Sequence, residues 1–210
     1  MVYRPVVYIV DDDPSVCRSL ALWLGFRSLA TSTYSRAEDF LAQIDSRAQG
    51  CAIVDVQMDG MSGLQLQSEL TARGIRLPLL FLTGHGDVPT VRAALKAGAF
   101  DFLEKPVDND KLLDMVAAAL SQDEGAWRDS QQQENLHERI ARLTAREREV
   151  MDLVVAGRHN REIAATLGIS ARTVEVYKAR LMDKLDVQRI ADLIRLVLKS
   201  GDASTAVRQH

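Results

Sequence analysis

Over the first 120 residues, short apolar runs alternate with stretches in which apolar residues recur at helical spacing. The apolar runs predict strands at 6–10, 29–34, 51–55, 79–83 and 100–103. The helical spacing predicts helices near 14–27, 36–47, 63–73, 88–97 and 108–120. Such alternation with short connections is typical of a parallel sheet covered by helices on both faces. We therefore predict a flavodoxin-like α/β domain with a five-stranded parallel sheet.

Residues 121–143 differ in composition, because glutamine and charged side chains dominate and large apolar ones are few. We predict a linker here that is helical for much of its length. Leu136, Ile140 and Leu143 share one helical face, which allows a weak helix–helix contact but is too short for a coiled coil. A solvated helical spacer is the favoured interpretation.

The C-terminal part of the chain has a purely helical pattern. Thr144 followed by Glu147 forms a capping box, and Asn160 and Ser170 are predicted to cap the next two helices. A fourth helix is predicted at roughly 188–199. Helices joined by short glycine-containing turns predict a small all-α helix-turn-helix domain of four helices.

The length of 210 residues accommodates two domains. The predicted organisation is a first domain at 1–120, a linker at 121–143, a helical domain at 144–200 and a disordered tail at 201–210. Residues 1–120 carry 11 basic and 15 acidic side chains, a charge of −4, whereas 144–199 carry 11 and 8, a charge of +3. This asymmetry suggests different ligands for the two domains, and the modest basic excess permits nucleic-acid binding without proving it.

Targeting signals and cysteine chemistry are not indicated. No run is long and apolar enough for a transmembrane helix, and the N-terminus lacks the apolar core of a signal peptide. Cys17 and Cys51 are expected to be small buried hydrophobic residues in a reducing compartment, with neither a disulfide nor a metal site. We therefore expect a cytoplasmic protein.

Polar side chains stand where the predicted strands end. Asp11 and Asp12 follow the first strand, and Asp55 ends the third. Thr83 ends the fourth strand, and Lys105 follows the fifth. The carboxyl ends of parallel strands form the usual ligand site of an open α/β sheet. Three carboxylates, a hydroxyl and an ammonium suit Mg²⁺ and a phosphoryl group, with one carboxylate as nucleophile.

Each of these residues also has an ordinary interpretation. Asp12 or Asp13 could cap the helix that begins at Pro14, and we expect Asp13 to do so or to face solvent. Thr83 alone could be a simple strand residue, and Lys105 alone a loop residue. It is their joint placement at four strand ends that favours phosphoryl chemistry.

Five short motifs connect this pattern with a known family. They are Ile9-Val10-Asp11-Asp12, Val54-Asp55-Val56-Gln57-Met58, Met61-Ser62-Gly63, Leu82-Thr83-Gly84 and Glu104-Lys105-Pro106. With them, residues 5–120 resemble the receiver domain of bacterial two-component response regulators. The run 83–88, Thr-Gly-His-Gly-Asp-Val, resembles the FixJ branch of the NarL/FixJ family.

The resemblance implies that Asp55 is the phosphoacceptor for a sensor histidine kinase. It also implies that Asp12, Asp55 and the backbone carbonyl of Gln57 bind Mg²⁺, with Asp11 assisting through water.

The same resemblance implies a switch. Thr83 would move toward the phosphoryl group, Lys105 would pair with it, and Phe102 occupies the position of the aromatic switch residue. The face that carries residues 87–106 would then pair with a second receiver domain.

Two residues depart from the family pattern. Asp59 stands where the family usually has proline, which adds a carboxylate near the metal loop and removes a restraint on φ. Ser28 stands where relatives often have glycine after the first helix, so that helix is expected to run on or to end differently.

A second set of motifs lies in the helical domain. It comprises Leu143-Thr144-Ala145-Arg146-Glu147-Arg148-Glu149-Val150, Asn160-Arg161-Glu162-Ile163-Ala164, the run 167–176, Lys178-Ala179-Arg180 and Lys184-Leu185. With them, residues 144–199 resemble the LuxR/NarL-type output domain. In relatives the fourth helix dimerises this domain, and it could equally just complete the small core.

The third helix of this domain is the predicted DNA-reading element. Its inward residues are predicted to be Val174, Tyr177, Leu181 and Leu185. Candidates for the major groove are Arg172, Glu175, Val176, Ala179 and Arg180, of which Glu175 suits cytosine and Val176 and Ala179 suit thymine methyls. Candidates for phosphate contacts are Thr173, Lys178, Arg180 and Lys184, and we add Asn160 and Arg161 as further DNA-binding candidates. The alternative is a solvated helix face on which Glu175 and Lys178 pair with each other.

We therefore predict a transcription regulator switched by phosphorylation. Its expected partners are a sensor histidine kinase, promoter DNA, RNA polymerase if it activates, and a second copy of the chain after phosphorylation.

Two alternatives stay open. One is an aspartyl-phosphate enzyme, for which no substrate pocket is indicated, so we expect no enzyme. The other is a phosphate-independent regulator, motivated only by Asp59.

Overall fold

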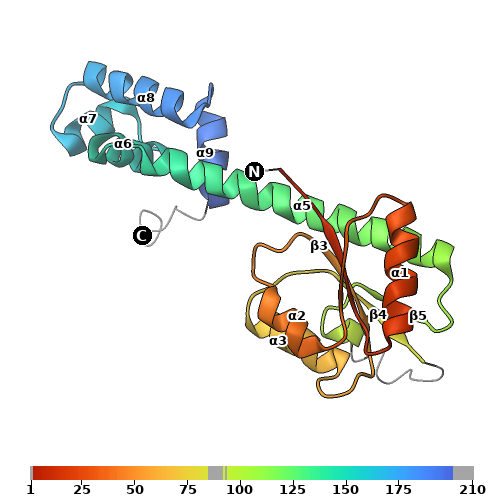
Figure 1. Cartoon of the computed structure of the whole chain (residues 1–210). Helices are drawn as coiled ribbons and strands as arrows, with labels where there is room; N and C mark the ends of the chain where they lie inside the picture. Colours follow the sequence, from red (N-terminus) through yellow and green to blue (C-terminus); the bar gives the residue numbers. More distant parts are fainter. Residues whose placement is uncertain (1, 85–91, 93, 201–210) are drawn as a thin grey trace. The chain divides into compact units, whose positions relative to one another are not determined.

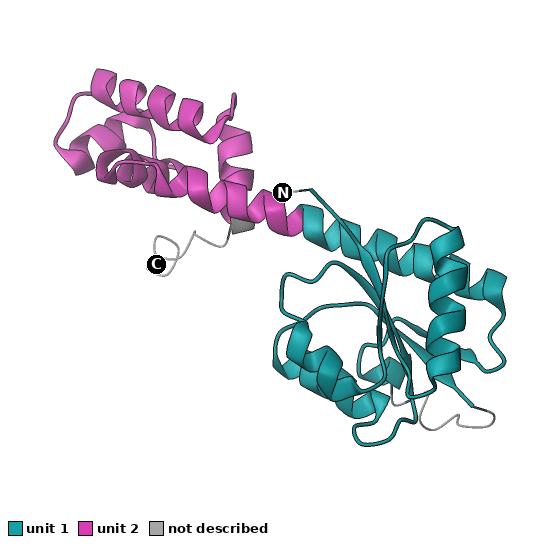
Figure 2. Ribbon diagram, viewed as in Figure 1, with its two compact units in different colours: residues 1–128 teal, residues 129–210 magenta. Residues whose placement is uncertain are grey.

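The computed structural model describes residues 2–84, 92 and 94–200 of the chain (Figure 1). The chain divides into two compact units, Met1–Arg128 and Asp129–His210 (Figure 2). Half of the helix predicted over 88–97 lies outside the described residues, and the predicted tail lies entirely outside them. Among the described helices, none combines the length and apolar character needed to cross a membrane.

The first unit is built on a five-stranded parallel sheet with the order β2-β1-β3-β4-β5. The strands are β1 (Val6–Val10), β2 (Thr31–Tyr34), β3 (Gly50–Asp55), β4 (Leu79–Thr83) and β5 (Asp101–Glu104). Every residue of β3 and β4 is buried, because these interior strands are covered on both faces. The predicted parallel sheet is confirmed, and its strand ends differ from the prediction by two residues or fewer.

Helices cover both faces of this sheet (Figure 1). Those that are fully described are α1 (Pro14–Phe26), α2 (Ala37–Gln43), α3 (Gly63–Ala72) and α5 (Asn109–Ala141). Only the first turns of α5 pack against the sheet among these described residues. Phe40 of α2 and Leu66 of α3 belong to the apolar cluster on one face. Leu24 of α1 and Leu112 of α5 belong to the cluster on the other face, together with the free, buried Cys17 and Cys51. The predicted burial of both cysteines is thus confirmed.

Ser28 sets the end of α1. Its φ of 59° is left-handed, and its N–H donates to the carbonyl of Gly25 at 3.0 Å. The N–H of Leu29 reaches back to the carbonyl of Leu24 at 3.2 Å, which closes the helix. The helix therefore ends at Phe26 and does not run on, and Ser28 carries the conformation that glycine adopts without steric cost.

Replacing Ser28 with glycine is expected to stabilise the first unit by about 1 kcal/mol, because the left-handed conformation costs a residue with a Cβ atom. Urea unfolding followed by tryptophan fluorescence measures this unit, since both tryptophans, Trp23 and Trp127, lie in it. Ser28→Ala keeps the Cβ atom and serves as the control that should not stabilise. Equal unfolding free energies for wild type and Ser28→Gly would show that Ser28 bears no such cost.

The stretch predicted as a helical linker is part of α5 as far as Ala141. The start of this stretch is anchored in the first unit. The buried Asp123 carboxylate accepts hydrogen bonds from the Gly50 N–H at 2.7 Å and the Tyr3 hydroxyl at 2.8 Å. The ring of Tyr3 also packs 5.6 Å from that of Trp127. The predicted limits of the linker, 121 and 143, stay a prediction.

The apolar face of the predicted linker packs inside the second unit. Ile140 is 2% exposed and Leu143 is 7% exposed, and Leu136 lies against the same cluster. The favoured interpretation of a solvated spacer is therefore wrong for this face, because the partner of the stripe is the helical domain of the same chain.

The rest of the second unit, as far as residue 200, has helices and no strands, as predicted. Its helices after α5 are α6 (Ala145–Val155), α7 (Asn160–Leu167), α8 (Ala171–Leu185) and α9 (Ile190–Ser200). The Thr144 capping box and the Ser170 cap are both present. Asn160 is not the cap of α7: His159 occupies that position, and its N–H donates to the carboxylate of Glu162 at 2.7 Å. The Asn160 amide oxygen instead accepts from the Lys178 ammonium at 3.1 Å.

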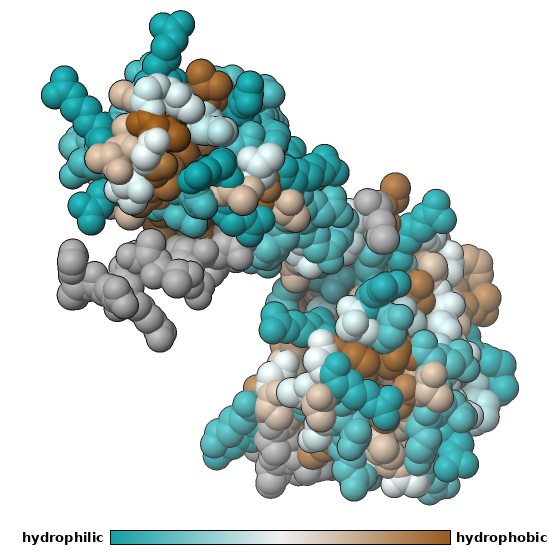
Figure 3. Space-filling view, turned by 90° about the vertical axis from the view of Figure 1, so that its left-hand side faces the viewer, coloured by the Kyte–Doolittle hydropathy of each residue, from teal (hydrophilic) through white to brown (hydrophobic). Residues whose placement is uncertain are grey.

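The predicted inward side of α8 is confirmed. Val174, Leu181 and Leu185 are fully buried, and Tyr177 packs against the same cluster. On the face shown in Figure 3, hydrophilic side chains predominate in both units and apolar ones form small groups. Each unit has its own apolar core.

Candidate functional site

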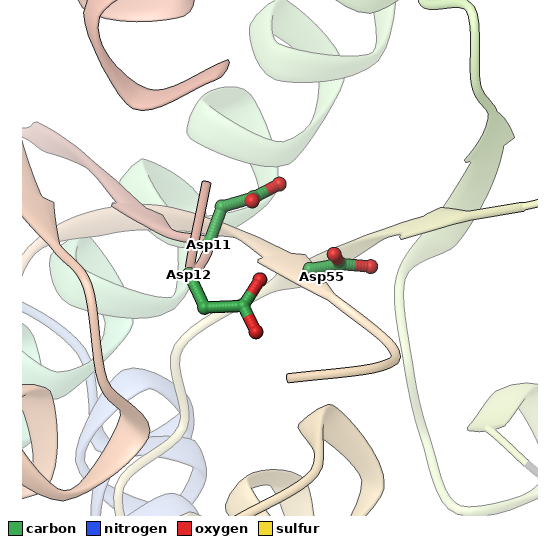
Figure 4. Close-up of side chains that lie close together, drawn as sticks. All are labelled: Asp11, Asp12 and Asp55. Atoms are coloured by element: carbon green, nitrogen blue, oxygen red, sulfur yellow. The ribbon is translucent and has the colours of Figure 1, made fainter. Parts of the chain in front are cut away.

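Three carboxylates meet at the carboxyl edge of the sheet (Figure 4). Asp11 directly follows β1, Asp12 comes next, and Asp55 ends β3. Strands β1 and β3 are hydrogen-bonded parallel neighbours, so their ends meet. One oxygen from each of the three carboxylates lies within 4.8 Å of the others. Asp11 is completely buried and Asp55 is 8% exposed, whereas Asp12 is open to solvent.

Lys105 joins this group from the end of β5. Its Nζ lies 2.8 Å from Asp11 Oδ2 and 2.8 Å from Asp55 Oδ2. Burial lowers the pKa of the Lys105 ammonium, but its hydrogen bonds with the two carboxylates outweigh burial, and the pKa lies above its ordinary value. Burial raises the pKa of the Asp55 carboxyl, and the hydrogen bond from Lys105 offsets only part of that shift.

The structure also shows where the other residues predicted for this site lie. Thr83 is buried at the end of β4, and its hydroxyl donates to the carbonyl of Gly84 at 3.2 Å. The backbone N–H of Gln57 reaches Asp55 Oδ1 at 3.3 Å. Phe102 is half-buried on β5 against the apolar cluster of α2 and α3. His85, in the run that resembles the FixJ branch, lies outside the described residues.

Asp13 is the N-cap of α1, as predicted, and accepts from the Ser15 N–H at 2.8 Å. The Asp13 N–H in turn donates to Asp11 Oδ1 at 2.9 Å. Both oxygens of Asp11 are thus engaged, one by Lys105 and one by this N–H.

Two residues next to the cluster have contacts that the sequence analysis did not predict. The backbone N–H of Asp59 donates to Asp12 Oδ2 at 2.8 Å. A Cβ atom on Gly63 would lie 2.4 Å from the carbonyl oxygen of Asp55, so only glycine fits beside the end of β3. The sequence carries a signal for Gly63 in the motif Met61-Ser62-Gly63, but a backbone N–H has no sequence signal.

A divalent cation fits the donor set of this site. Carboxylate oxygens are the hard ligands that Mg²⁺ prefers, and three of them converge here with a single ammonium group nearby. A hard cation bound here would neutralise charge during in-line transfer of a phosphoryl group to a buried carboxylate nucleophile.

The second unit presents helix α8 as its candidate nucleic-acid surface. The exposed residues among those predicted to contact DNA are Arg161, Arg172, Glu175, Val176, Ala179, Arg180 and Lys184. Lys184 and the remaining candidates have partners within the chain. Lys178 contacts Asn160 and not Glu175, and the Thr173 hydroxyl lies 2.7 Å from that of Ser170. Lys184 contacts the Glu147 carboxylate at 2.6 Å and the Arg142 carbonyl at 3.4 Å.

The ion pair of Lys184 and Glu147 fastens the end of α8 to the start of α6. Glu147 is 3% exposed, and its carboxylate also accepts from the Thr144 N–H at 2.8 Å. The hydrogen bond from Lys184, followed by that from Thr144, holds the pKa of the Glu147 carboxyl below its ordinary value of 4.5.

The second unit should accordingly lose stability as the pH falls below about 4.5, the ordinary glutamate value. A depressed pKa means that the folded state favours the charged carboxylate, so its contribution is present above 4.5 and disappears on protonation. Hydrogen exchange of the α8 amides, corrected for intrinsic rates, measures this loss in the whole protein. Glu147→Gln should lack this component of the pH dependence, and an identical acid profile for both proteins would refute the assignment.

Comparisons with known proteins identify a family for each of the two units of the chain. A model of the response regulator receiver domain matches residues 7–117, and a model of the luxR family of bacterial regulatory proteins matches residues 141–197. The transcriptional regulatory protein TdiR of Thauera aromatica is 43% identical over 97% of this chain and 90% of its own length. FixJ of Azorhizobium caulinodans is 42% identical over 94% of this chain and 93% of its own.

A solved structure supports the same conclusion. The response regulator StyR superposes with a TM-score of 0.85 and 38% identity, covering 93% of this chain and 99% of that one. A receiver fold with an acidic cluster and its lysine, followed along the chain by a helix-turn-helix unit, has the two parts of a two-component transcription factor. This chain belongs to the response regulators of the NarL/FixJ family, with a receiver domain and a LuxR-type DNA-binding domain.

Proposed function

We propose that Asp55 is the phosphoacceptor of this response regulator and that a sensor histidine kinase is the donor. The observation that supports the proposal most directly is Lys105 Nζ, 2.8 Å from both Asp11 and Asp55 at the carboxyl edge of the sheet. An oxygen of Asp55 would attack phosphorus while the bond from phosphorus to the donor's imidazole nitrogen breaks. The imidazole would leave with that electron pair.

Asp12, Asp55 and the backbone carbonyl of Gln57 would hold Mg²⁺, which when bound neutralises charge on the phosphoryl oxygens. Asp11 would act through water. This division of roles rests on the resemblance to the receiver domain, since both oxygens of Asp11 and both oxygens of Asp55 have partners within the chain.

The switch would begin with two exchanges of partner. The Thr83 hydroxyl would leave the Gly84 carbonyl for a phosphoryl oxygen, and Lys105 would follow the new negative charge. Phe102 would repack, and the face carrying residues 87–106, part of which lies outside the described residues, would pair with a second receiver. Two linked output domains would then occupy tandem half-sites with higher affinity and no new base contacts.

In the output domain, we propose that α8 enters the major groove. Glu175, Val176 and Ala179 would contact bases, and Arg172 and Arg180, with Arg161 on α7, would contact bases or phosphates. Asn160, Thr173, Lys178 and Lys184 already have intramolecular partners, which makes them the weaker candidates. We infer a cytoplasmic activator that engages RNA polymerase and turns over no substrate of its own.

The test combines mass and oligomeric state for the whole protein with Mg²⁺ and acetyl phosphate. Wild type should gain about 80 Da, one phosphoryl group on a carboxylate, shift to a dimer and bind promoter DNA more tightly. Asp55→Asn should do none of these, because an amide is not a nucleophile toward phosphorus. Dimerisation and tighter DNA binding of Asp55→Asn on addition of the phosphodonor would overturn the proposal. Wild type that gains no mass would point to a phosphate-independent regulator.

A further inference from the structure

The loop between β3 and α3 is tied to Asp12 of the acidic cluster through a backbone group. The N–H of Asp59 donates to Asp12 Oδ2 at 2.8 Å, across 47 residues of sequence. Asp12 lies in the loop between β1 and α1, and the same β3–α3 loop carries Gln57. The hydrogen bond thus joins the two loops that supply the proposed metal ligands.

Asp12 is the ligand that most needs such a restraint. Asp11 is buried and Asp55 nearly so, and both are held by Lys105. Asp12 is exposed, and the ion pairs of Lys105 do not include it. Its carboxylate is also repelled by the two neighbouring carboxylates, which favours rotamers that turn it into solvent. In the structure it nevertheless points toward Asp55 (Figure 4), with an oxygen within 4.8 Å of the others.

We propose that the backbone N–H of Asp59 is a positioning group for Mg²⁺: it holds the Asp12 carboxylate in its ligating orientation before the ion arrives. The N–H occupies Oδ2 and leaves Oδ1 on the same planar group for the metal. Donors that orient a metal-ligating carboxylate are a general feature of metal sites. The Asp59 carboxylate has no part in this role, since the cluster of oxygens within 4.8 Å consists of Asp11, Asp12 and Asp55. This inference rests on the proposed function, because it concerns the same metal site.

Two substitutions at one position separate the backbone from the side chain. Asp59→Pro removes the N–H, and Asp59→Ala removes the carboxylate but keeps the N–H. Mg²⁺ is titrated into each full-length protein and binding is followed by the NMR shifts of the backbone amides around the site. Asp59→Pro is expected to bind Mg²⁺ about tenfold more weakly than wild type, and Asp59→Ala to stay within about twofold of it. Equal affinities for Asp59→Pro and wild type, or equal weakening in both variants, would overturn the inference.

A second measurement does not depend on how the proline variant folds. In the wild-type protein without metal, the Asp59 amide should exchange with solvent slowly, because it is hydrogen-bonded. In Asp12→Ala, which removes the acceptor, that single amide should exchange faster while the amides of β3 keep their protection. An Asp59 amide that exchanges at the same rate in both proteins would also overturn the inference.

These outcomes are distinct from failure of the proposed function. Wild type that neither binds Mg²⁺ nor gains a phosphoryl group would refute the metal site itself. Wild type that binds Mg²⁺ as tightly as Asp59→Pro would refute only the role of the Asp59 N–H.

Discussion

Lys105→Met is expected to lower the free energy of unfolding of the first unit by about 3 kcal/mol. Lys105 Nζ lies 2.8 Å from both Asp11 and Asp55, and Asp11 is completely buried. Methionine fills a similar volume but leaves two neighbouring carboxylates with no ammonium group between them. Removing one partner of a buried ion pair costs more than the pair contributes, because the remaining charges stay desolvated. The partial exposure of Lys105, 29% for its side chain, places the expected value at the low end of the range for such pairs.

The measurement is urea unfolding without metal, followed by tryptophan fluorescence. Lys111→Met on the exposed surface of α5 is the matched control, and it should change the unfolding free energy by less than about 0.5 kcal/mol. Adding Asp55→Asn to Lys105→Met should recover part of the loss, because one of the two unpaired charges is then gone. The explanation fails if Lys105→Met and Lys111→Met unfold at the same urea concentration.

Gly50→Ala is expected to destabilise the first unit still more, by about 4 kcal/mol. The φ of Gly50 is +122°, which residues with a Cβ atom rarely adopt. A Cβ atom there would lie 1.9 Å from the backbone carbonyl oxygen of Val6, inside the pairing of β1 with β3. Neither strand can move away without loss of sheet hydrogen bonds. The backbone N–H of Gly50 would also lose its place against the buried Asp123.

Gly125→Ala is the matched control for Gly50→Ala. Gly125 lies in α5, and a Cβ atom there would meet no atom within 4 Å. Alanine is the better helix former, so this variant is expected to stabilise by about 0.5–1 kcal/mol. Both variants are compared by tryptophan fluorescence during urea unfolding. A Gly50→Ala protein as stable as wild type would mean that the strand ends adjust at little cost, contrary to what the close contact with Val6 implies.

Much of the site could be predicted because parallel strands impose a simple geometry. Asp11, Asp55, Thr83 and Lys105 each stand at the end of an apolar run, and the ends of such runs meet at one edge. The structure places Lys105 on two of the predicted carboxylates, in agreement with that reasoning. The roles of Thr83, Phe102 and the DNA-reading residues involve a phosphoryl group or DNA, and they stay predictions.

Local sequence patterns do not show which partner a side chain finds. The phosphate contact of Lys184 stays a prediction, but its ammonium has a partner that no local pattern indicates, Glu147, 37 residues earlier. Asn160 was predicted to cap α7, yet its amide accepts from Lys178. Ile140 lies on a stripe predicted to face solvent, and it is buried in the helical domain. In each case, a local pattern shows which face a side chain is on but not what lies opposite it.

The amino-acid sequence was sufficient to predict the class of both units, the position of nearly every described element and the carboxylates at the strand ends. These features follow from hydrophobic periodicity, capping residues and the alternation of strand and helix, all of which act over short stretches of chain. The folded structure alone reveals three further features: the hydrogen bond from the Asp59 N–H to Asp12, the lack of room for a side chain at Gly50 and Gly63, and the ion pair of Lys184 with Glu147. Those contacts join backbone or side-chain groups far apart in sequence, and their distances exist only once the sheet and the helical core have formed.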